Sequence, residues 1–296
     1  MTDYILLVVA AGLFSLMFLF NRGYQRSRGT GFDSVLSFSM YSNFFSLIIL
    51  LVLSAVGAFC AYRGIFADFK LEFSLFSLAV AVSGAAVNVG YAYFGIKALE
   101  ITNLSLYSIF AMLGGMLLPS VCGIIFFAEN MTLPKIACYL LIIASVFLTF
   151  EKGKTDRKAI FYYFGVFVLN GMSGVVSLIH QSNTAKAVNS NSYMVLTAAI
   201  CALVCLVCFL IKNKRFPALK LKECENIMGY AACTGLGNLF ALIALLNLDA
   251  SVQYPIITGG TMFFSTAVSL IIRERPTVRT LISAGVAAIS TILMMF

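Results

Sequence analysis

Apolar runs alternate with short polar segments along the whole chain. Ten runs can be drawn, at roughly residues 4–20, 34–60, 74–98, 104–128, 134–150, 159–182, 192–211, 226–247, 252–272 and 278–296. Most of them contain about 20 residues, which is long enough for a helix to cross a hydrocarbon core about 30 Å thick. The pattern predicts an all-α membrane protein with ten transmembrane helices.

Two stretches of the chain, 90–132 and 237–277, follow one plan. In each, a tyrosine follows a glycine by 17 residues, and a glutamate follows the second glycine of a Gly-Gly pair by 14 residues. The matched positions are Gly90 with Gly237, Tyr107 with Tyr254, Gly115 with Gly260, and Glu129 with Glu274. The chain therefore reads as two five-helix repeats, 1–152 and 153–296. Because five is odd, the repeats are predicted to be inverted, a plan typical of secondary transporters with a substrate site between the repeats.

The composition excludes a soluble protein, and the positions of the basic residues account for the positive net charge. Of the 296 residues, 61% are hydrophobic and 11% are charged, against about 25% charged in an average soluble domain. When each connection is numbered by the run before it, the odd-numbered connections hold 16 of the 20 Lys and Arg residues and the even-numbered ones hold 4. Basic connections favour the cytoplasmic side. We therefore expect a multi-pass protein of the cell (inner) membrane with both termini outside, and no nucleic-acid partner.

The first run and the cysteines both favour structural roles. The first run has neither the basic leader nor the small-residue cleavage pattern of a signal peptide, so we interpret it as a retained span. The eight cysteines lie mostly inside apolar runs without CxxC spacing, which indicates packing and not a metal site. We expect no metal and no cofactor.

The repeat plan resembles the EamA-like branch of the drug/metabolite transporter superfamily. The similarity is carried by Tyr254-Pro255 followed by a glycine pair, by Glu274-Arg275, and by Gly285 in the last helix. The chain departs from the pattern at Ser108, which stands where the second copy has Pro255, and it contains no Trp. The resemblance implies ten helices, alternating access, and export of amino acids or related metabolites.

Polar side chains at helical spacing mark the third, sixth and ninth runs. Such side chains are costly inside a membrane unless they face a cavity or another helix. Asn21 joins the candidates because it aligns with His180 when the repeats are matched. The candidate cavity residues are Asn21, Asn88, Tyr91, Tyr107, Asn170, Ser177, His180, Asn238, Tyr254 and Thr258.

Each kind of candidate has a structural alternative. The asparagines either line a cavity or hydrogen-bond between helices, and the hydroxyls of Ser and Thr favour helix packing. The tyrosines suit an aromatic or zwitterionic solute, or anchor the chain at the membrane surface. His180, the single histidine, either supports proton coupling or is solvated at the end of its span. No Asp or Glu lies at the middle of a run, so neutral or zwitterionic cargo is favoured.

Glycine, proline and glutamate complete the pattern in the fourth and ninth runs. The expected points of helix bending and gating are Gly114, Gly115, Pro119, Pro255, Gly259 and Gly260. Proline removes a backbone hydrogen bond and can bend a helix. Glu129 and Glu274 close their runs beside basic residues and are expected to cap or anchor them.

These features favour a carrier of a small organic metabolite. We expect it to be embedded in the lipid bilayer as a monomer or a homodimer. A multidrug exporter of lipophilic compounds is the alternative in the same class. An enzyme acting on lipids would need clustered His, Asp, Glu or Ser residues, and a channel would need a repeated filter signature. A nucleotide-driven pump would need a GxxxxGK[ST] loop, which this chain lacks.

Overall fold

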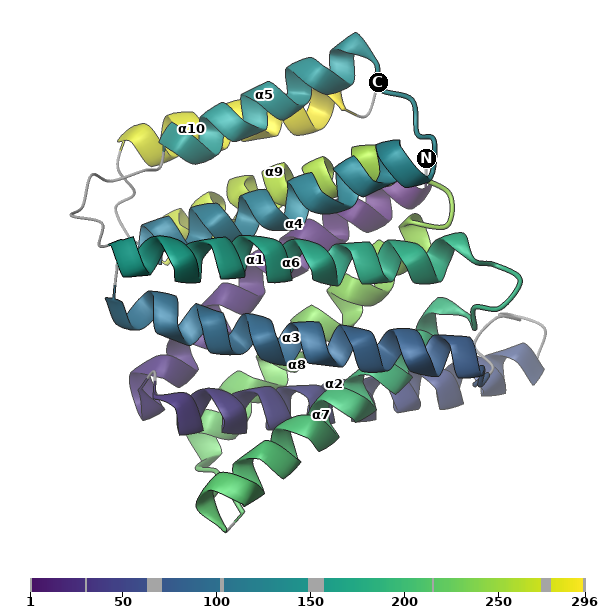
Figure 1. The fold of residues 1–296 in the computed structure, drawn as a ribbon, viewed down its shortest axis with the longest axis vertical. Coiled ribbons are helices and arrows are strands. Elements are labelled where there is room, and N and C mark those ends of the chain that lie inside the picture. Colours follow the sequence, from purple (N-terminus) through teal and green to yellow (C-terminus); the bar gives the residue numbers. More distant parts are fainter. Residues whose placement is uncertain are drawn as a thin grey trace.

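Long helices account for most of the protein in the computed structural model (Figure 1). The structure describes residues 2–29, 31–62, 71–101, 104–148, 157–214, 216–272 and 278–294. Within these ranges there are helices, turns and short irregular connections but no strands. The all-α prediction is confirmed for this part of the chain.

The helix bounds follow the predicted runs closely. The helices are α1 (Thr2–Arg28), α2 (Phe32–Tyr62), α3 (Leu75–Ile101), α4 (Leu104–Phe126), α5 (Leu133–Leu148), α6 (Arg157–Ser182), α7 (Ser190–Asn213), α8 (Leu221–Ala244), α9 (Ala250–Ile271) and α10 (Val278–Leu293). The largest difference is at the end of α1, which continues eight residues beyond the predicted run. Most of those residues are polar, Tyr24 packs into a buried aromatic cluster, and Arg28 at their end binds another helix.

The chain is a multi-pass membrane protein by the length and composition of its helices. Seven described helices are long and apolar enough to cross a membrane, and the apolar segments 110–126, 133–148 and 278–293 are shorter. Large apolar side chains point outward along the bundle, as at Leu140 and Leu203, which are 63% and 60% exposed. Lipid-facing surfaces have this character, because only apolar groups are stable against acyl chains.

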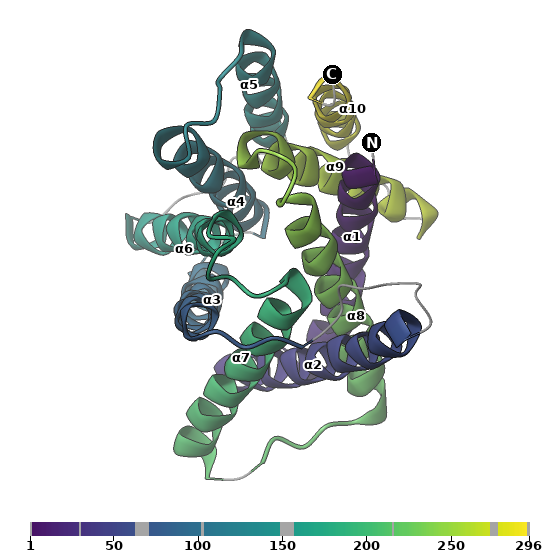
Figure 2. The same ribbon diagram turned by 90° about the vertical axis from the view of Figure 1, so that its right-hand side faces the viewer.

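The helices pack in layers around the middle of the molecule (Figure 2). Helices α3, α6 and α4 form one side, with α6 packed on both of the others, and α1 and α8 pack together to form the opposite side. The pair α2 and α7 joins the two sides at one edge, and α9 joins them at the other, where α5 and α10 pack as a further pair.

The connections meet at two opposite ends of the bundle. At the end that we call the odd end, the α1–α2 and α7–α8 connections meet, where Arg28 Nη1 donates to the Ala218 carbonyl oxygen at 2.6 Å. At the opposite, even end, the α2–α3 and α6–α7 connections meet, where Ser74 Oγ donates to the Lys186 carbonyl oxygen at 2.6 Å. In the described part of the chain, the first and seventh connections therefore meet at one end, and the second and sixth meet at the other.

The even end also holds the α4–α5 and α8–α9 connections and the N-terminus. Lys135 Nζ lies 3.1 Å from Asp249 Oδ2, and Asn247 Nδ2 donates to Asp3 Oδ1 at 3.2 Å. Figure 1 shows both marked chain ends on this side of the bundle. The alternation of ends along the chain is what successive membrane crossings require.

The two predicted repeats are interleaved. Helix α1 packs on α8 and α9, α4 and α3 pack on α6, and α2 packs on α7 and α8. Most extensive contacts thus join a helix of the first five to one of the second five. The boundary between 1–152 and 153–296 lies outside the described residues, and the division into two units stays a prediction.

Close approach of α4 and α6 depends on glycine. A methyl group at Gly114 would overlap the backbone of Phe167, and one at Gly171 would lie 2.6 Å from the Gly114 carbonyl oxygen. Small residues allow membrane helices to come within backbone contact, where dispersion forces hold them together. Gly114 therefore lies at a helix crossing.

The glycine pair of α9 has a similar packing role. A methyl group at Gly259 would overlap Thr291 Oγ1 of α10, and one at Gly260 would lie 2.9 Å from Ala11 Cβ of α1. Gly259 thus faces α10 and Gly260 faces α1. Bending at these glycines during gating stays a prediction, but their close packing already accounts for the absence of side chains.

Pro119 and Pro255 lie inside α4 and α9, as predicted. Pro255 has no backbone N–H, so the Ser251 carbonyl oxygen one turn earlier loses its usual helical partner. The Tyr139 hydroxyl of α5 supplies that bond at 2.8 Å. A hydrogen bond from a neighbouring helix therefore compensates for the proline.

We predict that Gly114→Ala lowers the midpoint of thermal unfolding in detergent, because the added methyl group forces α4 and α6 apart. Overpacking of this kind costs about 1–3 kcal/mol. Gly285→Ala is the matched control, since no atom lies within 4 Å of a methyl group there. Equal midpoints for the two variants would contradict the proposed helix crossing.

Candidate functional site

Asn88 joins three helices at mid-depth in the bundle. It is the middle residue of α3 and is half-buried. Ser173 Oγ of α6 donates to Asn88 Oδ1 at 3.3 Å, and Asn88 Nδ2 lies 3.9 Å from Cys201 Sγ of α7. Both contacts are long, and a primary amide can make about four hydrogen bonds. Asn88 therefore retains capacity to bind a solute.

Asn170 is held much more firmly. Its Nδ2 donates to the Ala111 carbonyl oxygen of α4 at 2.6 Å. A methyl group at Gly115 would lie 2.7 Å from the same nitrogen. Asn170 therefore ties α6 to α4, and of the two readings offered by the sequence, its contacts favour helix packing.

His180 lies in a closed aromatic pocket at the even end of α6. The side chain is fully buried, its Nε2 lies 3.0 Å from Ser77 Oγ, and its ring stacks on Tyr193 with centroids 3.9 Å apart. Nδ1 has no hydrogen-bond partner within the described residues. The interpretation of His180 as a solvated residue is wrong, because α3 and α7 cover it.

The polar face of α9 lies inside the bundle. Tyr254 Oη donates to the Gly174 carbonyl oxygen at 3.0 Å, and Thr258, one turn later, is buried. Further along the same face, the hydroxyls of Thr261 and Ser265 are buried without a hydrogen-bond partner in the described part of the chain. The polar face predicted for the ninth run is therefore interior, and its hydroxyls retain unused hydrogen-bonding capacity.

Ser177 and Tyr91 extend the polar surface around Asn88. Ser177 Oγ donates to the Ser173 carbonyl oxygen of its own helix at 3.1 Å. Tyr91 is half-buried beside the cluster of Ala98, Ala111, Tyr163 and Val166.

The predicted residues on α1 and α8 are less closely joined to this surface. Asn21 lies toward the odd end and accepts a bond from Gln25 of its own helix at 3.2 Å. Asn238 is exposed on α8. Helix α6 makes no extensive contact with α1 or α8 in the described ranges. Within the described residues, the structure brings Asn88, Ser173, Ser177 and Tyr254 together around α6 and leaves Asn21 outside.

Glu129 caps α9. The backbone N–H groups of Ala250 and Ser251 each donate to one carboxylate oxygen of Glu129 at 2.8 Å. A carboxylate is stable there because free N–H groups and the helix dipole favour negative charge. Glu129 thus caps a helix, but the helix is α9 and not the fourth run, which it was expected to cap or anchor. Glu274 and the side chain of Tyr107 lie outside the described residues.

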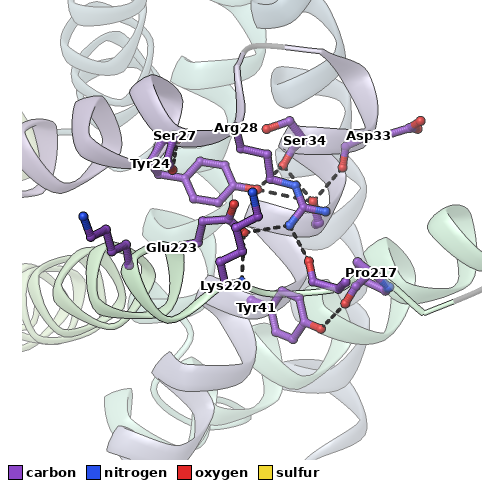
Figure 3. A network of polar contacts seen from close by, with 12 residues as sticks. Tyr24, Ser27, Arg28, Asp33, Ser34, Tyr41, Pro217, Lys220 and Glu223 are labelled. Atoms are coloured by element: carbon purple, nitrogen blue, oxygen red, sulfur yellow. Dashed lines mark hydrogen bonds and ion pairs between the residues drawn. The ribbon is translucent and has the colours of Figure 1, made fainter.

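A buried ion pair joins α1 and α8 at the odd end of the bundle (Figure 3). Arg28 Nη1 lies 3.0 Å from Glu223 Oε2, and the Glu223 side chain is 3% exposed. The same oxygen accepts the Lys220 backbone N–H at 3.2 Å, at the start of α8. Because a buried charge left without its partner is very unfavourable, this contact holds α1 and α8 firmly together.

The even end is closed by backbone-centred bonds. Glu72 N–H donates to Ser192 Oγ at 2.8 Å, and Asn189 N–H donates to Glu72 Oε2 at 3.2 Å. Together with the bond from Ser74 to Lys186, they hold the α2–α3 connection against the start of α7. The even end also holds the ion pair of Lys135 with Asp249, in which the Asp249 side chain is 51% exposed.

Several of these residues are not identifiable from sequence patterns. Ser77 and Tyr193 enclose His180, but neither has a sequence pattern that distinguishes it. Glu223 had a signal, since an acid in the first turn of a helix commonly caps it. Its pairing with Arg28 depends on the packing of α1 against α8.

The site shows no metal-binding group within the described residues. No three His, Cys, Asp or Glu side chains lie close enough there to hold an ion. The interior polar groups described on α3, α6 and α9 are amides, hydroxyls and phenols. Such groups bind uncharged or zwitterionic solutes by hydrogen bonds.

Comparison with known proteins identifies the fold and no activity. No protein-family model matches the chain, and no curated protein matches it. A solved structure described as "Crystal structure of protein" matches with a TM-score of 0.75 and 14% sequence identity, over 99% of this chain and 96% of that one. The two chains share a fold over almost their whole lengths.

We predict that Asn170→Leu and Asn88→Leu differ in their effect on stability. Asn170→Leu removes a short bond to α4 and crowds Gly115, so it should cost about 1–3 kcal/mol. Asn88→Leu loses only two long contacts and should change stability by less than about 1 kcal/mol. Thermal unfolding of both variants in detergent measures the difference; equal losses would show that Asn88 is also held by packing.

Proposed function

We propose that this chain is a secondary transporter, similar to the EamA-like drug/metabolite transporters, that exports a small organic metabolite such as an amino acid across the inner membrane. The observation that carries the proposal is the contact of Asn88 with Ser173. It places hydrogen-bonding groups of both predicted repeats at the middle depth of the bundle. Substrate sites of inverted-repeat carriers lie at such a position.

The packing of the helices supports inverted repeats. If each helix of the first five is exchanged for its counterpart in the second five, the pair α1 and α8 becomes α6 and α3. The pair α4 and α6 becomes α9 and α1, and the pair α2 and α8 becomes α7 and α3. All of these pairs are packed in the structure, as a two-fold relation between the repeats requires.

Ten crossings agree with the arrangement of the ends. Helices α5 and α10 contain 16 residues each, or about 24 Å of helix, and they pack as a pair beside α9. The described connections alternate between the two ends, and the odd-numbered connections carry most of the basic residues in the sequence. This distribution supports a cytoplasmic odd end and external termini.

The closed ends fit a carrier that opens to one side at a time. Alternating access requires contacts at each end that separate in turn. The ion pair of Arg28 with Glu223 provides such a contact at the odd end, and the bonds of Glu72 and Ser74 provide one at the even end.

The polar groups at mid-depth favour neutral or zwitterionic cargo. Asn88 contacts the hydroxyl of Ser173, and the hydroxyl of Ser177 lies one turn further along α6. Neither a carboxylate nor an ammonium group lies among them, so a cation or an anion would find no opposite charge. Hydrogen bonds from these groups would distinguish a polar metabolite from a lipophilic drug.

We predict that Asn88→Leu lowers export by about tenfold, corresponding to roughly 1.4 kcal/mol of lost interaction with the solute. The measurement compares metabolites in the medium and in extracts of cells that carry the intact protein or a variant at matched membrane abundance. Ser83→Leu is the control, because Ser83 is an exposed serine on the same helix that bonds only to Ala79.

Accumulation of one or a few amino acids in the medium with the intact protein and Ser83→Leu, but not with Asn88→Leu, supports the proposal. A difference only in resistance to lipophilic compounds would favour a multidrug exporter. Identical profiles for all three proteins would contradict a role for Asn88 in transport.

A further inference from the structure

The segment between α7 and α8 is fixed to the bundle by its backbone. Tyr41 Oη donates to the Pro217 carbonyl oxygen at 2.6 Å, and Arg28 donates to the Ala218 carbonyl oxygen at 2.6 Å. Leu219 packs against the cluster of Tyr24, Phe38 and Ile227. The carbonyl groups of Pro217 and Ala218 and the side chain of Leu219 therefore hold the segment in a defined position; the bond of Tyr41 to Pro217 is drawn in Figure 3.

The residues on either side of this anchor face outward and are basic or apolar. Lys214, Lys220 and Lys222 are exposed. Phe216 and Leu221, which lie between them in sequence, are 72% and 79% exposed. We call these five residues the basic strip. Its composition is that of a surface which meets headgroups and acyl chains together.

Nearby acids leave most of the charge of the basic strip unneutralised. Asp33 is paired with Lys212 at 2.6 Å, and Glu223 is paired with Arg28 at 3.0 Å. Glu225, exposed on the first turns of α8, offsets at most one positive charge. The strip thus carries an excess of positive charge beside exposed apolar side chains.

The basic strip lies at the odd end and at the outer edge of the bundle. Figure 1 shows the end of α7 and the start of α8 at one corner of the molecule, and Figure 2 shows the connection running outside the packed helices. Lipids of the leaflet at the odd end can therefore reach the strip from the side, without entering the bundle.

We propose that the basic strip binds the headgroups of anionic phospholipids in this leaflet. The three ammonium groups contact phosphate oxygens, while Phe216 and Leu221 enter the acyl-chain boundary. Each lysine close to an anionic membrane surface adds a favourable electrostatic interaction. This site is independent of the proposed transport function, since it involves neither Asn88 nor the polar surface around it.

A single tryptophan reports on this site, because the chain contains none of its own. Phe216→Trp protein is placed in bilayers of phosphatidylcholine and phosphatidylglycerol, and quenching of its fluorescence by brominated forms of each lipid is compared. We expect brominated phosphatidylglycerol to be enriched on the order of fivefold at this position. Lys214→Gln, Lys220→Gln and Lys222→Gln together should abolish the enrichment.

Two controls distinguish lipid binding at the basic strip from a general attraction of anionic lipids to the protein. Phe73→Trp places a reporter on an exposed position at the even end and should show no preference between the lipids. Arg279→Gln, which removes an exposed charge from α10, should leave the preference at Phe216→Trp intact. Equal quenching by both lipids at Phe216→Trp, or a preference that survives the triple substitution, would overturn the proposal.

Discussion

Every polar group that this chain carries into the bundle has to find a partner from protein, because acyl chains offer none. The clearest case is at α9, where Pro255 leaves the Ser251 carbonyl oxygen without its helical donor and Tyr139 of α5 replaces it. Glu129 does the same for the first N–H groups of that helix. In both cases the compensating group comes from the other predicted repeat, so the repeats stabilise one another.

The same constraint determines where function can reside. Asn170 has a short hydrogen bond and His180 is closely packed, so the contacts of both residues stabilise the packing of the helices. Asn88, Thr261 and Ser265 are interior polar groups with weak or absent partners. Such groups are costly in an apolar surrounding unless a ligand or water completes their hydrogen bonds. The proposed transport function relies on groups of this kind, above all on Asn88.

Much of the fold was predictable from the sequence, since apolar runs of membrane-spanning length leave few alternatives to helices. The bounds of α2, α3 and α6 agree with prediction within a few residues, and alternation of ends follows from connectivity. The site was predicted only in part. Spacing identifies Asn88 and Asn170 as members of polar faces, but it cannot show that Asn170 reaches the backbone of α4. The burial of His180 depends on Ser77 and Tyr193, which lie far from it in sequence and have no distinctive pattern.

The central claim, that the surface around Asn88 opens alternately to the two ends, is tested most directly by cysteine accessibility. Asn88→Cys in a background without native cysteines is combined with one of two cross-linked pairs. Arg28→Cys with Glu223→Cys locks the odd end, and Ser74→Cys with Lys186→Cys locks the even end. Alternating access predicts that an impermeant maleimide reaches Asn88→Cys only from the even end in the first protein and only from the odd end in the second. Labelling from the same end in both proteins, or from neither end, would contradict the account.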